Sequence, residues 1–187
     1  LTAWTARSFV TTQAGASARH ATLAQYKDKI VVFGDSFIEF YEFYVPSSGT
    51  CPIQQVNTLR ISGYGVYSNT PTSSQQQAGD NRVYEAMDTV FWINRSGLDP
   101  GAGVYALSNY GPKKLSTPDI DATLEKTADG AVRIAGITKF FGFNYLVIAT
   151  GDQSTDHVLA YCFETGIWVV WTAALFSDTA LTFIGNN

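Results

Sequence analysis

Charged side chains are scarce in this sequence. Asp, Glu, Lys and Arg make up 15% of its 187 residues, against roughly a quarter in an ordinary soluble domain. The formal net charge is −4, and the longest basic run is the dipeptide Lys113-Lys114. This balance excludes a protein that holds nucleic acid by a cationic patch. A weakly acidic surface can still let DNA pass, because like charges keep the polyanion from adhering to it.

Cysteine and histidine are also rare, with two of each. Cys51 and Cys162 are far apart in sequence, as are His20 and His157. No further Cys or His lies near any of them at the spacing typical of metal ligands. We therefore predict neither a zinc site nor a disulfide framework, and we expect both cysteines to be free and mostly buried. No apolar run approaches the roughly 18 to 20 residues of a transmembrane helix, so no membrane-spanning segment is predicted.

Aromatic residues are abundant instead, at 14%, and they concentrate in three repeating units. Each unit has an apolar strand, a turn rich in Gly, Asp, Asn or Ser, and a second, aromatic-rich strand. The strand pairs span residues 29–34 and 37–44, 88–94 and 103–107, and 144–149 and 157–163, and a further strand at 167–171 closes the third unit. The repeat of about 55 to 60 residues is near the periods of β-propeller blades. The sequence therefore predicts an all-β fold of about three propeller-like, blade-like units.

These units divide the chain into two parts. Residues 1–25 are rich in Thr, Ala and Ser, and we expect them to form an opening strand, at residues 7–10, and a linker. Residues 26–187 are expected to form one domain of blade-like repeats. Within it, Pro and Gly mark residues 45–57 as a loop. The polar stretch at 68–81 cannot bury enough apolar surface to pack, which predicts an exposed insertion.

One short helix is predicted after the second unit. Thr117 suits the N-cap, Pro118 suits the first helical position, and the acidic residues that follow favour the positive end of a helix. Ile120 and Leu124 lie one turn apart on the same face. The pattern predicts two to three turns.

One motif points to a nucleophile. The strand at 29–34 leads into Gly34-Asp35-Ser36, which resembles the nucleophile block of the GDSL serine esterases. That family supplies its base from an Asp-x-x-His motif, whereas here Ser154 stands three residues before His157. A Gly-Asp-Ser between two apolar strands also has the composition of a hairpin turn. We predict a turn, and a serine esterase that uses Ser36 is the less favoured alternative.

Other candidate residues have structural explanations. The carboxylate pairs Asp119/Asp121 and Glu39/Glu42 are expected at a helix start and at solvent-facing strand positions, and a glycosidase would need two carboxyls that converge on a cleft. Aromatic residues in strands usually pack in the core, but exposed ones can stack on sugars. The candidates are Tyr41, Tyr44, Tyr64, Tyr67, Trp92, Tyr105, Tyr110, Trp168 and Trp171. A glycan-binding β module is therefore the other alternative.

Short motifs in the first two units resemble those of a known family. An apolar strand ending in Gly34 leads into a Glu-bearing aromatic strand at 37–41. The glycine motif Gly63-Tyr64-Gly65, an apolar strand at 88–93, a Gly-Val-Tyr strand and a Ser-Thr helix start follow in that order. This order resembles the tail hub, or packaged-DNA stabilisation, proteins (tail nozzle type) of short-tailed bacteriophages. The resemblance covers residues 26–126, and residues 141–171 fit as a further blade.

The resemblance implies a structural virion protein of the phage tail. It implies a homo-oligomeric, hexameric ring below the portal and head-tail adaptor proteins. Such a ring retains packaged DNA and guides double-stranded DNA through its lumen on ejection, without sequence-specific binding. It implies no catalytic residues, no cofactor and no metal. A closed propeller usually needs four or more blades, so three units predict either a fragment of a full propeller or a ring completed by another chain.

Overall fold

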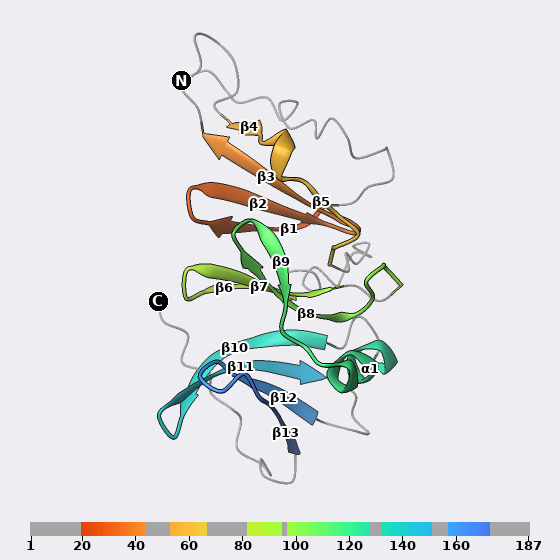
Figure 1. The fold of residues 1–187 in the computed structure, drawn as a ribbon, viewed down its shortest axis with the longest axis vertical. Helices are drawn as coiled ribbons and strands as arrows, with labels where there is room; N and C mark the ends of the chain where they lie inside the picture. The colour runs from red at the N-terminus through yellow and green to blue at the C-terminus, as the bar shows by residue number, and fades with distance from the viewer. Residues whose placement is uncertain are drawn as a thin grey trace, which may run out of the picture.

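The computed structural model describes residues 20–43, 53–66, 82–94, 97–127, 132–150 and 157–172. These residues form three antiparallel sheets and one short α-helix (Figure 1). In each sheet, strands that follow one another in sequence lie side by side, and only β5 departs from this order. The prediction of a mostly β fold with one short helix is confirmed.

The first sheet has the order β1 (His20–Tyr26), β2 (Lys29–Gly34), β3 (Phe37–Phe43) and β4 (Ile53–Gln55), and β5 (Ile61–Ser62) also pairs with β3. A 3-10 turn, η1 (Asn57–Leu59), lies between β4 and β5. The second sheet has the order β6 (Val83–Ala86), β7 (Thr89–Asn94), β8 (Gly103–Ser108) and β9 (Gly111–Lys114). The third has the order β10 (Val132–Phe140), β11 (Phe143–Thr150), β12 (His157–Cys162) and β13 (Trp168–Thr172).

The predicted strands correspond to β2 and β3, β7 and β8, and β11 to β13. Several neighbouring strands were missed. β1 begins at His20, inside the predicted linker, and β4 lies inside the predicted loop at 45–57. β4, β6 and β9 are short and carry polar residues, so their apolar alternation is too weak to be recognised. The predicted strand at 7–10 and the insertion at 68–81 lie outside the described residues.

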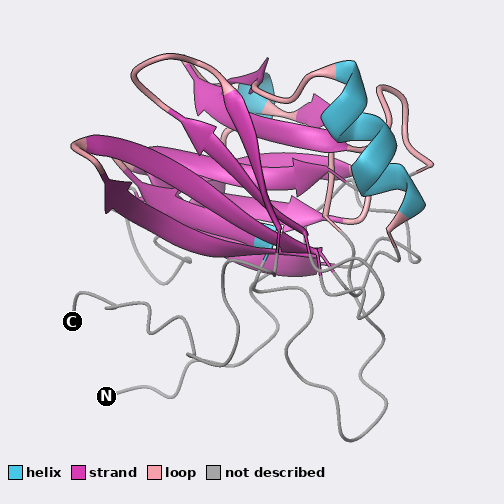
Figure 2. Ribbon diagram, turned by 90° about the horizontal axis from the view of Figure 1, so that it is seen from below, coloured by secondary structure: helices cyan, strands magenta, loops and turns pink. Residues whose placement is uncertain are grey.

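The three sheets stack on one another in sequence order, as Figure 1 shows from the side and Figure 2 from below. Between the first and second sheets, Phe33 and Phe40 share one buried cluster with Trp92. The Phe33 and Trp92 ring centroids are 5.6 Å apart. Between the second and third sheets, a separate cluster contains Phe91 and Leu146. Burial of each such side chain contributes about 1.5 to 3 kcal/mol, which holds the sheets face to face.

The middle sheet is buried on both of its faces. Successive side chains of a strand point to opposite faces, so Val90 and Trp92 of β7 contact the first sheet while Phe91 and Ile93 contact the third. All four side chains are buried. This explains why β7 is a continuous apolar run, which is typical of a strand covered on both faces.

The predicted helix, α1 (Pro118–Lys126), follows the N-cap Thr117 and has Pro118 in its first turn. Ile120 and Leu124 are buried in the cluster between the second and third sheets. The helix therefore lies at one end of the strands, where Figure 2 shows it beside the stack. Both its start and its buried face agree with the sequence.

Each sheet contains a two-residue hairpin at the same place. Lys27, Met87 and Phe141 occupy the first position of the turns β1–β2, β6–β7 and β10–β11, with φ of 55°, 54° and 49°. The three turns lie on one side of the stack, at the left in Figure 1. None has the Asn-Gly or Asp-Gly sequence that usually marks such turns. The repeat is therefore clearer in the backbone than in the sequence.

The left-handed conformation of Met87 makes this turn a site for stabilisation. A non-glycine side chain in this region costs about 1 to 2 kcal/mol, and Asn tolerates it better than Met. We expect Met87→Asn to raise the free energy of unfolding by about 0.5 to 1 kcal/mol, measured by urea denaturation. Lys113→Asn is the control, because Lys113 is also exposed but lies in a strand without positive φ. Equal effects of both substitutions would contradict the turn argument.

Candidate functional site

Ser36 lies in a hairpin turn. β2 ends at Gly34 and β3 begins at Phe37, so Asp35 and Ser36 form the connection, as predicted. The Ser36 and Gly34 carbonyls accept hydrogen bonds from the Gly63 and Val66 amides at 3.0 and 2.9 Å. The chain continues as a strand, where an esterase would need a loop and a helix. His157 begins β12 in the third sheet, and the second sheet lies between it and Ser36 (Figure 1).

The described residues hold no group of three or more His, Cys, Asp or Glu side chains that could bind a metal ion. Cys162 is buried and free, as expected, while Cys51 lies outside the described residues. The one helix of the described region is too short to cross a membrane.

The glycine motif at 63–65 packs against the Gly-Asp-Ser turn. A Cβ at Gly65 would lie 2.4 Å from the carbonyl carbon of Asp35, so only glycine fits this approach. Gly63 has a φ of 82°, and a Cβ there would lie 2.7 Å from the carbonyl oxygen of Asp99. Two motifs that are far apart in the sequence therefore form one contact in the first sheet.

Asn94 connects this contact to the second sheet. Its side chain is buried and accepts a hydrogen bond from the Gly65 amide at 2.8 Å. The Asn94 amide also donates to the Gly101 carbonyl at 2.7 Å. The Tyr64 ring packs edge-on against the rings of Trp92 and Tyr105. The segment at 61–66 thus joins the first two sheets through both polar and aromatic contacts.

A second polar cluster joins the second sheet to the helix. The Ser116 hydroxyl accepts from the Val104 amide at 3.0 Å and donates to Asp121 Oδ1 at 2.5 Å. Lys114 Nζ lies 2.5 Å from Asp121 Oδ2. A Cβ at Gly103 would lie 3.0 Å from both Asp121 Oδ1 and Ser116 Oγ, which explains the glycine there. The motif residues that carry the phage resemblance thus make structural contacts.

Glu39 is fully buried, so its predicted solvent-facing position was wrong. It accepts a hydrogen bond from the Tyr41 hydroxyl at 3.0 Å, and Arg60 Nε lies 3.7 Å away. β3 is buried along most of its length on both faces, so strand alternation did not bring Glu39 to solvent. Burial, followed by the bond to Glu39, raises the pKa of Tyr41 above its ordinary range. Glu42 follows the prediction better, because it is partly exposed.

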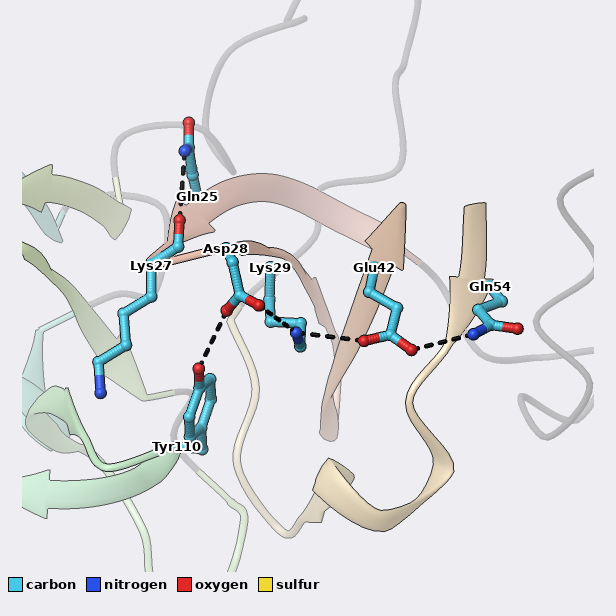
Figure 3. Close-up of polar contacts among 7 residues, drawn as sticks. All are labelled: Gln25, Lys27, Asp28, Lys29, Glu42, Gln54 and Tyr110. Atoms are coloured by element: carbon cyan, nitrogen blue, oxygen red, sulfur yellow. Dashed lines mark hydrogen bonds and ion pairs between the residues drawn. The ribbon is translucent and has the colours of Figure 1, made fainter. Parts of the chain in front are cut away.

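A chain of polar contacts crosses the first sheet at one end of its strands (Figure 3). The Tyr110 hydroxyl, from the second sheet, donates to Asp28 Oδ1 at 3.1 Å. Lys29 Nζ lies 2.5 Å from Asp28 and 3.2 Å from Glu42, and Gln54 donates to Glu42 at 2.9 Å. We call these five residues the polar chain. It runs from the β8–β9 turn to the outer strand β4.

The polar chain holds its charged groups in their ionised forms. The hydrogen bond from Lys29 lowers the pKa of Asp28. The Gln54 amide and then Lys29 lower the pKa of Glu42. Asp28 in turn raises the pKa of Lys29. Beside the polar chain, Lys27 Nζ lies 4.9 Å from the centre of the Tyr110 ring.

Two hollows lie between adjacent sheets. The first, of about 440 Å³, lies between the β1–β2 and β6–β7 hairpins and is lined by residues such as Lys27, Glu85 and Asp88. The second, of about 300 Å³, lies between the second and third sheets and is lined mainly by apolar side chains such as Phe91 and Phe163. Neither lining contains Ser36 or His157.

Most of the described aromatic residues that were candidates for sugar stacking pack in or against the hydrophobic core. Trp92, Tyr105 and Tyr41 are buried, and the Trp168 indole donates to the Leu115 carbonyl at 2.9 Å. Tyr44 and Tyr67 lie outside the described residues. The exposed aromatics are instead Phe140, Phe141 and Phe143 at the β10–β11 hairpin, together with Phe43. This hairpin was not predicted, although the Phe-Phe-Gly-Phe run at 140–143 is a signal of it in the sequence.

Comparison with known proteins adds no assignment to this geometry. No protein-family model matches the chain, and no curated protein is significantly similar to it.

Removal of the Asn94 amide should destabilise the junction of the first two sheets. Asn94→Ala leaves the Gly65 amide and the Gly101 carbonyl without partners, and each such group costs about 1 to 3 kcal/mol when buried. We expect a loss of about 2 to 4 kcal/mol in urea unfolding. Ser62→Ala, at an exposed position of the same segment, should change stability by less than about 0.5 kcal/mol. A loss below about 1 kcal/mol for Asn94→Ala would show that water replaces the amide.

Lys29→Met should raise the pKa of Asp28 and Glu42 toward their ordinary values of 3.8 and 4.5, as followed by NMR titration of the carboxyl groups. The pKa of Glu42 should stay partly lowered, because the hydrogen bond from Gln54 remains. A lowered carboxyl pKa stabilises the fold above the unfolded pKa, and this stability is lost as pH falls through the folded pKa. The wild type should therefore lose more stability than Lys29→Met below about pH 4.5. Lys113→Met, at an exposed lysine, is the control, and equal pKa changes in both variants would contradict the assignment.

Proposed function

We propose that this chain is a structural virion protein of a short-tailed phage, a tail hub subunit that acts by shape and assembly. The observation that carries the proposal is the stack of three consecutive antiparallel sheets, each built on a meander of four strands, with β5 added to the first, and each with a two-residue hairpin on the same side. Four-stranded antiparallel sheets arranged side by side are the units of β-propellers. The order of motifs in the first two sheets, and their convergence on Gly65 and Asn94, supports the same reading.

The exposed apolar residues support assembly into a ring. Of the large apolar side chains exposed in the described region, only Met87 belongs to the middle sheet. The others lie in the first or third sheet: Leu23, Phe43, Phe140, Phe141, Phe143, Ile167, Val169 and Val170. Apolar surface gathered on the two outer sheets of a stack marks interaction sites. Head-to-tail contact between the third sheet of one copy and the first sheet of the next would continue the stack and close a hexameric ring.

The charge distribution supports passage of DNA through such a ring. The net charge is −4, and Lys29 and Lys114 are held in ion pairs with carboxylates. A weakly acidic lumen would guide double-stranded DNA during ejection without retaining it. In this proposal the neighbours of the ring are the portal and the head-tail adaptor, and no catalytic residue or cofactor takes part.

Particle mass and shape test the ring. Light scattering behind a sizing column, with negative-stain imaging of the peak, should show a ring with an axial opening. Leu23→Lys places a charge on the outer face of the first sheet and should reduce the mass, because a buried charge opposes contact. Met87→Lys is the matched control, since Met87 is 58% exposed against 66% for Leu23 but lies in the middle sheet. A wild-type monomer, or equal effects of both variants, would contradict the proposal.

A further inference from the structure

The three sheets end in very different outer strands. β4 has three residues, Ile53–Gln55, two of them glutamine. β9 (Gly111–Lys114) carries Pro112 and two lysines. β13 (Trp168–Thr172) reads Trp-Val-Val-Trp-Thr and has neither charge nor proline. Shortness, lysine and proline are the usual means by which proteins protect a sheet edge from pairing with another chain. Of these three outer strands, β4 and β9 are therefore protected and β13 is not.

β13 also has the side chains of an interior strand. Val169 and Val170 point to opposite faces of the sheet, yet they are 38% and 50% exposed. Ile167, just before the strand, is exposed as well. A strand that is apolar on both faces is typical of a position covered on both faces, so the exposed Val169 and Val170 leave apolar surface for a further contact. Among the described residues, only β12 pairs with β13.

The backbone bonds show which groups this edge offers. The Cys162 amide donates to the Ile167 carbonyl at 3.0 Å, so Ile167 belongs to a hydrogen-bonded pair with β12. Bonded and non-bonded pairs alternate along antiparallel strands. In the register of β12 and β13, Val169 therefore bonds to β12, while Val170 directs its N–H and C=O toward the free edge. Trp168 and Thr172 do the same.

We propose that this edge pairs with the β13 edge of a second copy, antiparallel and about a two-fold axis. Such an axis places Val170 opposite Val170 of the second copy, and it aligns the outward N–H and C=O groups of both strands. Val169 then lies opposite Trp171 on the same face, a β-branched and aromatic pair that stabilises sheets. The two third sheets become one continuous sheet.

A second copy fits this edge because the edge is complementary to itself. An added strand has to be extended, uncharged and apolar on both faces, and β13 meets all three conditions. No like charges face each other across the axis. A two-fold contact also consumes both free edges, so it gives a discrete pair instead of an open filament. The contact differs from head-to-tail ring contacts and forms whether or not a ring does.

The mass of Val170 variants tests the pairing. Val170→Pro removes the outward N–H and reproduces in β13 the proline that β9 already has. Val170→Lys places two like charges opposite each other at the axis. Light scattering at several protein concentrations should show that both variants have one half or less of the wild-type mass. Val170→Thr keeps the branched shape and the N–H and should keep the wild-type mass, and far-UV circular dichroism checks that every variant is folded.

Amide exchange measured by NMR tests the same contact independently of any ring. The Val169 amide, bonded to β12, should stay protected at every protein concentration. The Val170 amide should be protected at high concentration and lose this protection on dilution. A wild-type monomer at all concentrations, or a mass that neither Val170→Pro nor Val170→Lys reduces, would overturn the pairing. A Val170 amide unprotected at high concentration would also overturn it, even if a ring is present.

Discussion

Both faces of the middle sheet are apolar, and the need to cover them governs the whole arrangement. Adjacent residues of β7 are buried in two different hydrophobic clusters, one shared with the first sheet and one with the third. Neither outer sheet alone could remove both faces from water. The stack of three is therefore the smallest arrangement of these sheets that buries the aromatic side chains of the second unit.

Polar groups then fix how the first two sheets meet. Apolar contact is non-directional, whereas the Asn94 amide bonds two backbone groups at defined places. Gly65 allows the backbone of one motif to approach the turn of another. At one end of the strands, the polar chain from Tyr110 to Gln54 links the second sheet to the outermost strand of the first. The residues that look most like a catalytic motif therefore help to position the sheets.

The two ends of the stack differ from its middle in a way that matters for assembly. Exposed apolar side chains gather in the first and third sheets, while two of the three outer strands are protected from pairing. Faces and edges offer different contacts. A face joins another face by apolar packing, and an edge joins another edge by backbone hydrogen bonds. The proposed ring uses the faces, and the proposed two-fold pairing uses the outer edge of β13.

The sequence by itself determined the central strands, the turn at Asp35-Ser36 and the start of the helix at Thr117. These depend on local chemistry: apolar alternation, turn-forming residues and a capping pattern. It missed β1 and β4, because their own apolar alternation is weak, although each pairs with a strand next to it in sequence. Only the tertiary structure decided that Glu39 is buried and that, among the described residues, β13 pairs only with β12. A period of two residues assigns a side chain to a face, but which faces and edges are covered depends on the strands and sheets packed beside them.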